Sequence, residues 1–160
     1  ISWAEKAVGK IFEGANFGVK LLSGELKVNE IASELVVRKL KNIVNKENKK
    51  YDYVIIDTAA GTSCPVVEAL QGCDEAVIVT EPTPLGKHDL KLMLEVASDL
   101  SLESSVVINK STVGDDSGIR SLEVKIIGSI PYSKKIVHDY VKGVPVEHAS
   151  IKKLARHFSK

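Results

Sequence analysis

Four short apolar runs, each rich in β-branched residues, constrain the fold more than any other feature of the sequence. They lie at residues 53–56, 76–79, 105–108 and 124–128. Continuous apolar runs of this length are typical of strands that are buried on both faces of a parallel sheet. Segments with helical periodicity lie between and after these runs, at about 65–71, 87–100, 115–121, 133–141 and 149–158. The alternation predicts a doubly wound α/β fold, with a mostly parallel sheet and helices on both faces.

The part of the chain before the first run has a different pattern. Residues 1–28 predict short strands and turns, with extended candidates at 8–12 and 18–22 that glycines separate. Asn29 is the predicted N-cap of a helix over about 30–47, in which apolar residues recur at helical spacing. We therefore expect residues 1–28 to form a strand-rich opening segment and 29–160 the α/β part of a single partial domain.

Composition excludes several classes of protein. The 160 residues carry 22 Lys and Arg against 21 Asp and Glu, a balance that does not indicate nucleic-acid binding. No uncharged run approaches the roughly 18 residues of a membrane span. Cys64 and Cys73 do not form a CxxC motif, so a cytoplasmic protein, with peripheral membrane contact as an alternative, is the expectation.

Polar and turn-forming residues follow each of the four apolar runs. The first run is followed by Asp57 to Pro65, the second by Thr80-Glu81-Pro82, the third by Asn109-Lys110 and the fourth by Ile130-Pro131-Tyr132. The carboxyl ends of parallel strands meet at one edge of the sheet, where such folds bind ligands. The sequence therefore predicts a ligand site built from these four loops.

Two of these loops suggest nucleotide chemistry. An Asp at the tip of a buried strand can hold Mg²⁺ through water, and Gly61 would let the backbone N–H approach a γ-phosphate. The alternative for Asp57 is a simple turn cap. The amide of Asn109 can donate to and accept from a purine edge, although it too could only start a turn. Guanine-reading motifs place Asp where this chain has Thr112, which favours adenine.

Residues 57–65, DTAAGTSCP, resemble the switch II motif of the MinD/ParA/Mrp family of P-loop ATPases. Residues 79–90 and 107–111 resemble the branch of that family that carries an inserted ferredoxin module, and residues 24–47 resemble the part that follows the insertion. Ala59-Ala60 departs from the proline pair that the family usually has in switch II.

This resemblance implies a molecular switch that depends on ATP and forms a homodimer. It also implies a link to redox or iron–sulfur chemistry, with a redox or iron–sulfur protein as a partner. It implies that Asp57 holds magnesium and the catalytic water, and that Gly61 senses the γ-phosphate. Asn109 would face adenine, Pro131 and Tyr132 would line the base pocket, and Thr80 and Pro82 would lie on the nucleotide side of the next strand.

The family's phosphate-binding loop is missing from the sequence. Neither Gly9-Lys10 nor Gly86-Lys87 is followed by Ser or Thr, so neither forms the loop that cradles phosphates. Two cysteines cannot hold a four-iron cluster by themselves, so a cluster would lie in an upstream module. We expect the chain, which begins at Ile1, to be the carboxyl-terminal part of a larger ATPase and to bind ATP weakly or not at all. Without the P-loop strand, the strands ending at Asp57 and Thr80 would close up directly or leave an edge that pairs between chains.

Other interpretations compete with this one. A non-catalytic partner-binding or dimerisation module is the main alternative. The basic segment 133–160, with seven Lys or Arg and two acids, could bind DNA or a membrane, but a packed final helix is the favoured interpretation. Cys64 is expected to be a small buried residue at a helix start rather than a cluster ligand, and the His88-Asp89 and His138-Asp139 pairs are not expected to bind metal.

Overall fold

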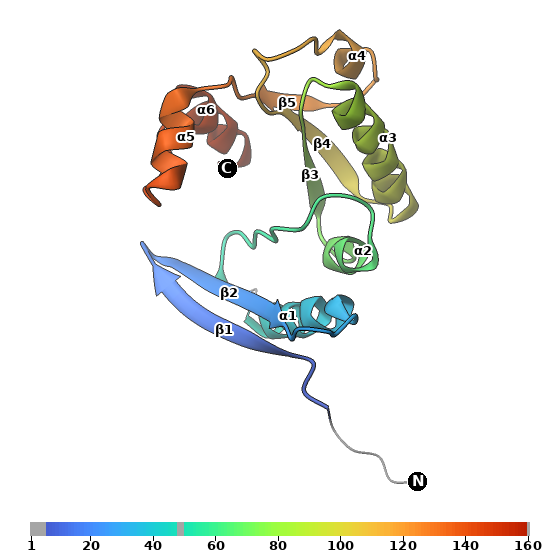
Figure 1. Cartoon of the computed structure of the whole chain (residues 1–160), viewed down its shortest axis with the longest axis vertical. Coiled ribbons are helices and arrows are strands. Elements are labelled where there is room, and N and C mark those ends of the chain that lie inside the picture. The colour runs from blue at the N-terminus through green and yellow to red at the C-terminus, as the bar shows by residue number, and fades with distance from the viewer. Residues whose placement is uncertain (1–5, 48–49, 160) are drawn as a thin grey trace. The chain divides into compact units, whose positions relative to one another are not determined.

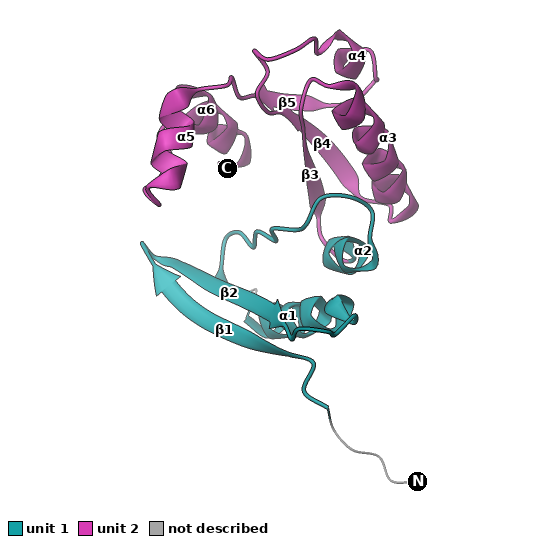
Figure 2. Ribbon diagram, viewed as in Figure 1, with its two compact units in different colours: residues 1–71 teal, residues 72–160 magenta. Residues whose placement is uncertain are grey.

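The chain divides into two compact units in the computed structural model, which describes residues 6–47 and 50–159. Unit 1 comprises residues 1–71 and unit 2 residues 72–160 (Figure 2). Figure 1 labels the strands and helices of both units. The expectation of a single partial domain over 1–160 stays a prediction.

Unit 1 begins with a β-hairpin. β1 (Gly9–Asn16) pairs antiparallel with β2 (Val19–Leu26), so the extended segments predicted at 8–12 and 18–22 are confirmed. Phe17 and Gly18 connect the strands with φ angles of 49° and 78°. Positive φ at both central residues is what a two-residue type I′ turn requires, and its twist matches that of the strands.

Helix α1 (Ser33–Glu47) packs on one face of this hairpin. A Cβ at Gly24 would clash with Val36 and lie 3.1 Å from the Leu40 side chain, so glycine permits the close approach of strand and helix. The predicted helix is confirmed, but Asn29 is not its N-cap. Asn29 lies in the preceding turn with φ 67°, a left-handed conformation that Asn tolerates better than most residues.

The strand predicted at 53–56 is wrong. These residues belong to neither sheet of the described chain, and the side chain of Ile55 is 91% exposed. A strand is stable only when a neighbour satisfies its backbone groups, and among the described residues the sheets are β1-β2 and β3-β4-β5. Direct closure of the strands ending at Asp57 and Thr80, one of the two alternatives, is therefore wrong as well, whereas edge pairing between chains, the other alternative, stays a prediction. Unit 1 ends with α2 (Cys64–Leu70).

Unit 2 contains a parallel sheet in the order β3-β4-β5. Its elements are β3 (Glu75–Thr80), α3 (Pro84–Asp99), β4 (Glu103–Ile108), α4 (Ser117–Arg120), β5 (Ile126–Ser129), α5 (Lys134–Val141) and α6 (Ala149–Phe158). Each of the three strands overlaps a predicted apolar run, so the α/β fold class with a parallel sheet is confirmed.

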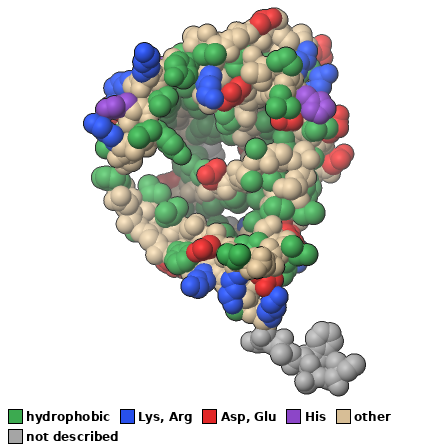
Figure 3. Space-filling model, viewed as in Figure 1, with side chains coloured by type: hydrophobic (Ala, Val, Ile, Leu, Met, Phe, Trp, Pro, Cys, Tyr) green, Lys and Arg blue, Asp and Glu red, His purple; other side chains and the backbone are tan. Residues whose placement is uncertain are grey.

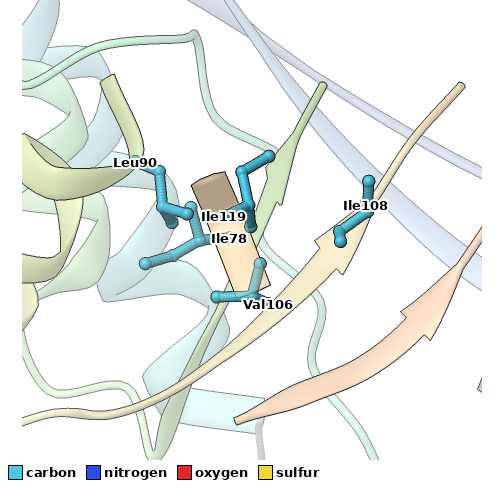
Figure 4. Close-up of a cluster of buried hydrophobic side chains, with 5 residues drawn as sticks. All are labelled: Ile78, Leu90, Val106, Ile108 and Ile119. Atoms are coloured by element: carbon cyan, nitrogen blue, oxygen red, sulfur yellow. The ribbon is translucent and has the colours of Figure 1, made fainter. Parts of the chain in front are cut away.

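The hydrophobic core lies on one face of this sheet. Side chains from two strands and from α3 and α4 form it: Ile78, Leu90, Val106, Ile108 and Ile119 (Figure 4). On the other face, Leu154 of α6 lies 3.2 Å from the position of a Cβ on Gly128. Gly128 pairs with Val107, which is also buried, so β4 is covered on both faces as its apolar run predicts.

Candidate functional site

The loops that follow the three strands of unit 2 meet at the carboxyl edge of the sheet. The backbone N–H of Asn109 donates to the Thr80 carbonyl at 2.7 Å, and the backbone N–H of Ser111 donates to the Ile130 carbonyl at 2.9 Å. The amide of Ile130 donates to the Ile108 carbonyl at 2.8 Å. These bonds bring the predicted site residues Thr80, Asn109 and Pro131 to one edge, while their role in binding stays a prediction.

Thr80 and Pro82 are buried and hold the start of α3 in place. The Thr80 hydroxyl donates to the Gly86 carbonyl at 2.9 Å, and the Gly86 amide donates to the Thr83 hydroxyl, the N-cap of α3, at 3.0 Å. A Cβ on Gly86 would clash with the Glu81 carbonyl. A Cβ on Gly114, whose φ is 136°, would likewise clash with the Pro82 carbonyl. The buried pair therefore sets the path of the loop rather than offering polar side chains to a ligand.

The accessible part of this edge combines an amide, an ion pair and an aromatic ring. Asn109 and Pro131 are half-buried, whereas Tyr132 is exposed and its amide donates to the Thr112 hydroxyl at 3.1 Å. Lys110, with φ 50°, forms a 2.7 Å ion pair with Glu81. A planar aromatic ring and a side-chain amide, which has both donor and acceptor groups, are each able to contact a nucleobase.

Asp57 and Gly61 belong to unit 1, in the segment between α1 and α2. Both are exposed. Gly61 has φ 92°, and a Cβ there would meet no atom within 4 Å. Glycine at this position supplies a left-handed backbone with open space around it, as a close approach to a phosphate requires. The Asp57 carboxylate supplies the oxygen ligands that Mg²⁺ prefers.

A shallow pocket of about 280 Å³ in unit 1 was not predicted from the sequence. Its lining comes from α1, α2 and the loop before α2: Glu34, Arg38, Thr62, Cys64, Val67, Glu68 and Gln71. Arg38 donates to both carboxylate oxygens of Glu68, at 3.1 and 2.9 Å, and this pair lowers the pKa of Glu68. Lys41 donates to the carbonyls of Glu68 and Gln71 near the end of α2. These contacts span about thirty residues, and no local sequence pattern reveals them.

Several other predicted features can be placed. Cys64 is exposed at the start of α2, so the expectation that it is buried is wrong, and Cys73 is half-buried. Within residues 6–47 and 50–159, no three His, Cys, Asp or Glu side chains are grouped as metal ligands would be. No described helix is long and apolar enough to cross a bilayer. The apolar residues Ile151, Leu154 and Phe158 of α6 are half-buried, while Lys152, Lys153 and Arg156 are exposed, as in a packed amphipathic helix.

Comparison with known proteins gives the site a context. No protein-family model matches the chain. Uncharacterized protein MJ0579 of Methanocaldococcus jannaschii is 36% identical over 143 residues, which cover 89% of this chain and 50% of that protein. Uncharacterized ATP-binding protein MJ0685 of the same organism is 28% identical over 114 residues, covering 67% of this chain and 45% of that protein. The chain thus spans about half the length of the curated relatives it matches.

A solved structure agrees with these relatives. The cell division ATPase MinD of Pyrococcus furiosus matches with a TM-score of 0.66 and 25% identity, over 75% of this chain and 56% of that one. The chain therefore has the α/β fold of the MinD ATPases and is similar in sequence to an archaeal ATP-binding protein.

Proposed function

We propose that the chain supplies the switch and base-contact elements of a magnesium-dependent ATP site, in a molecular switch of the MinD/ParA type. The observation that carries the proposal is the convergence of the Thr80, Asn109 and Ile130 loops through backbone hydrogen bonds at the carboxyl edge of the parallel sheet. Ligands bind at this edge in open α/β sheets. The fold shared with MinD and the similarity to an ATP-binding protein favour a nucleotide as that ligand.

Each candidate residue has a role that its surroundings suit. The half-buried amide of Asn109 and the exposed ring of Tyr132, next to Pro131, contact adenine, while buried Thr80 and Pro82 fix the loop that presents them. Asp57 holds Mg²⁺ through water, and the Gly61 amide donates to the γ-phosphate. Bound magnesium would stabilise the charge that develops on the transferred phosphoryl group.

The phosphate-binding loop of this site is proposed to come from residues outside the present sequence, which contains no such motif. The exposed apolar segment 53–56 supports this part of the proposal, because a strand inserted beside it would cover the exposed side chain of Ile55. The ferredoxin module, its iron–sulfur cluster, a redox partner, a homodimeric complete form and a cytoplasmic location are proposed on the family resemblance alone.

Nucleotide titration with and without a phosphate-binding loop tests the proposal. We expect the 160-residue chain alone to bind Mg·ATP weakly or not at all, and its complex with a polypeptide that carries the loop to bind and hydrolyse ATP. Micromolar affinity of the chain alone would overturn the split site. Binding without hydrolysis in the complex would favour the non-catalytic partner-binding alternative.

Two substitutions in that complex test the residue roles. Asp57→Asn is expected to lower kcat by about 10²-fold or more, because the magnesium water shell loses a charged acceptor. Asp52→Asn removes the same charge from another exposed residue of the segment and is the matched control, expected to keep wild-type kcat. Asn109→Ala is expected to weaken ATP binding by about tenfold and to narrow the preference for ATP over GTP. Equal kcat in Asp57→Asn and Asp52→Asn would contradict the assignment.

A further inference from the structure

The β1–β2 hairpin has one face packed on α1 and one face open. Gly9 and Gly24 approach the Val36 side chain, and Gly24 pairs with Ile11, so this face of the hairpin lies against the helix. Successive side chains of a strand alternate between faces. The opposite face therefore carries Lys10, Phe12, Gly14 and Asn16 from β1, and Val19, Leu21, Ser23 and Glu25 from β2, and we call it the outer face.

All eight residues of the outer face are exposed. The large apolar side chains among them are well exposed: Phe12 by 49%, Val19 by 65% and Leu21 by 64%. Figure 3 shows hydrophobic side chains spread among polar ones over the face in view, and the exposures above identify those of the outer face. Single exposed apolar residues need no explanation, but three on one face of a two-stranded ribbon form a patch that burial against a partner would stabilise.

Cross-strand neighbours on the outer face differ in charge or in size. Lys10 lies opposite Glu25, Phe12 opposite Ser23, and Gly14 opposite Leu21. The first row thus joins opposite charges, and the next two each join a large apolar side chain to a small residue. The space above Gly14 is open, since a Cβ there would meet no atom within 4 Å.

This pattern is complementary to itself when two copies are related by a two-fold axis parallel to the strands. Rotation about such an axis places β1 of one copy over β2 of the other, row on row. Lys10 then faces the second copy's Glu25, Phe12 lies over its Ser23, and its Leu21 fills the open space above Gly14. Each contact occurs twice, as in any interface between identical surfaces.

We propose that the outer face of the β1–β2 hairpin is a homodimer interface, in which two copies stack face to face with Lys10 of each against Glu25 of the other. The paired charges and the fit of large over small residues favour a second copy over an unrelated partner. The face provides fewer residues than the roughly 20–30 per side of a standard interface, so the dimer is weak and depends on concentration. The interface contains no residue of the proposed nucleotide site, so it forms without ATP.

Charge reversal provides a sharp test by sedimentation of the 160-residue chain without nucleotide. Lys10→Glu and Glu25→Lys are each expected to be monomeric at concentrations at which the wild type dimerises, because like charges would face each other twice. An equimolar mixture of the two variants is expected to dimerise, since position 10 of the first variant, now acidic, faces position 25 of the second, now basic. Within each variant, residues 10 and 25 carry like charges whether or not the two variants are mixed. Recovery of the dimer in the mixture therefore reports the contact between copies. Lys27→Glu makes the same charge change just after β2 and is expected to dimerise like the wild type.

Gly14→Leu tests the steric part of the fit. The added side chain meets open space in the single chain, so the melting temperature is expected to be kept while dimerisation is lost. The proposal is overturned if the wild type stays monomeric up to about 1 mM, if the mixture stays monomeric, or if Gly14→Leu dimerises normally. None of these outcomes bears on ATP binding, so failure here and failure of the proposed function are distinguishable.

Discussion

Single residues fix the loops at the carboxyl edge of the β3–β4–β5 sheet. Gly86 and Gly114 each sit where a Cβ would clash with a backbone carbonyl, of Glu81 and Pro82 respectively. Backbone cannot move aside as the end of a long side chain can. The Thr80 hydroxyl adds a hydrogen bond to the Gly86 carbonyl at 2.9 Å. Contacts within the chain itself thereby hold the start of α3 and the loop after β3 together.

Asp139 carries a pH dependence that can be measured. It is buried on α5, where Lys135 lies 2.5 Å and His138 3.3 Å from its carboxylate oxygens, and their hydrogen bonds lower the pKa of Asp139. A lowered pKa in the folded state stabilises the fold above the ordinary Asp pKa of about 3.9, and this contribution is lost as the pH falls through the lower value. We expect Asp139→Asn to be less stable than the wild type near neutral pH and the difference to shrink in acid.

Urea unfolding between neutral pH and acid measures this difference. Asp89→Asn is the matched control, because Asp89 also follows a histidine on a helix but is exposed. Its stability is expected to run parallel to that of the wild type across the pH range. A constant gap between Asp139→Asn and the wild type at every pH would show that the carboxylate charge is not what stabilises α5.

At the scale of elements, the local sequence pattern predicted those helices and strands whose formation depends on local interactions. The hairpin, the helices and the three strands of unit 2 follow from periodicity and turn residues. Residues 53–56 have the same apolar, β-branched character as β4, yet only β4 has neighbours on both edges. Strand formation depends on a partner that the run itself does not encode. The convergence of the site loops was predictable from parallel topology, whereas the Arg38–Glu68 pair joins two helices that carry no joint signal.

Leu90 and Ile55 allow a direct comparison between an apolar residue that is packed in a core and one that is exposed. Leu90 on α3 is 1% exposed and packs in the core of unit 2, whereas Ile55 is almost fully exposed. Leu90→Ala is expected to lower the free energy of unfolding by about 2–5 kcal/mol, because it leaves a cavity. Ile55→Ala is expected to change it by less than about 0.5 kcal/mol. Chemical denaturation of both variants checks this, and a large loss in Ile55→Ala would mean that residues 53–56 are packed in the folded chain.

At the scale of the whole molecule, burial is unevenly divided between the two units. The five residues of the core cluster all lie in unit 2. In unit 1, the fully buried apolar residues among those described are Val66 and Ala69 of α2, and α1 buries none. A two-stranded hairpin is at best marginally stable by itself, so unit 1 has the weaker basis for independent stability.

This imbalance predicts that the two units open at different free energies. In hydrogen exchange of the whole chain, the amides of β4 are expected to be the most protected, because Val106, Val107 and Ile108 are buried there. The amides of β1 and β2 are expected to exchange much faster, at protein concentrations low enough to keep the chain monomeric. A fragment of residues 72–160 is then expected to fold alone and to keep the β4 protection, since it contains the whole core cluster. Leu90→Ala in that fragment should remove the protection, whereas Leu92→Ala, a partly exposed leucine on the same helix, should leave most of it. Uniform exchange across both units, or an unfolded fragment, would instead mean that the chain is stable only as one cooperative body.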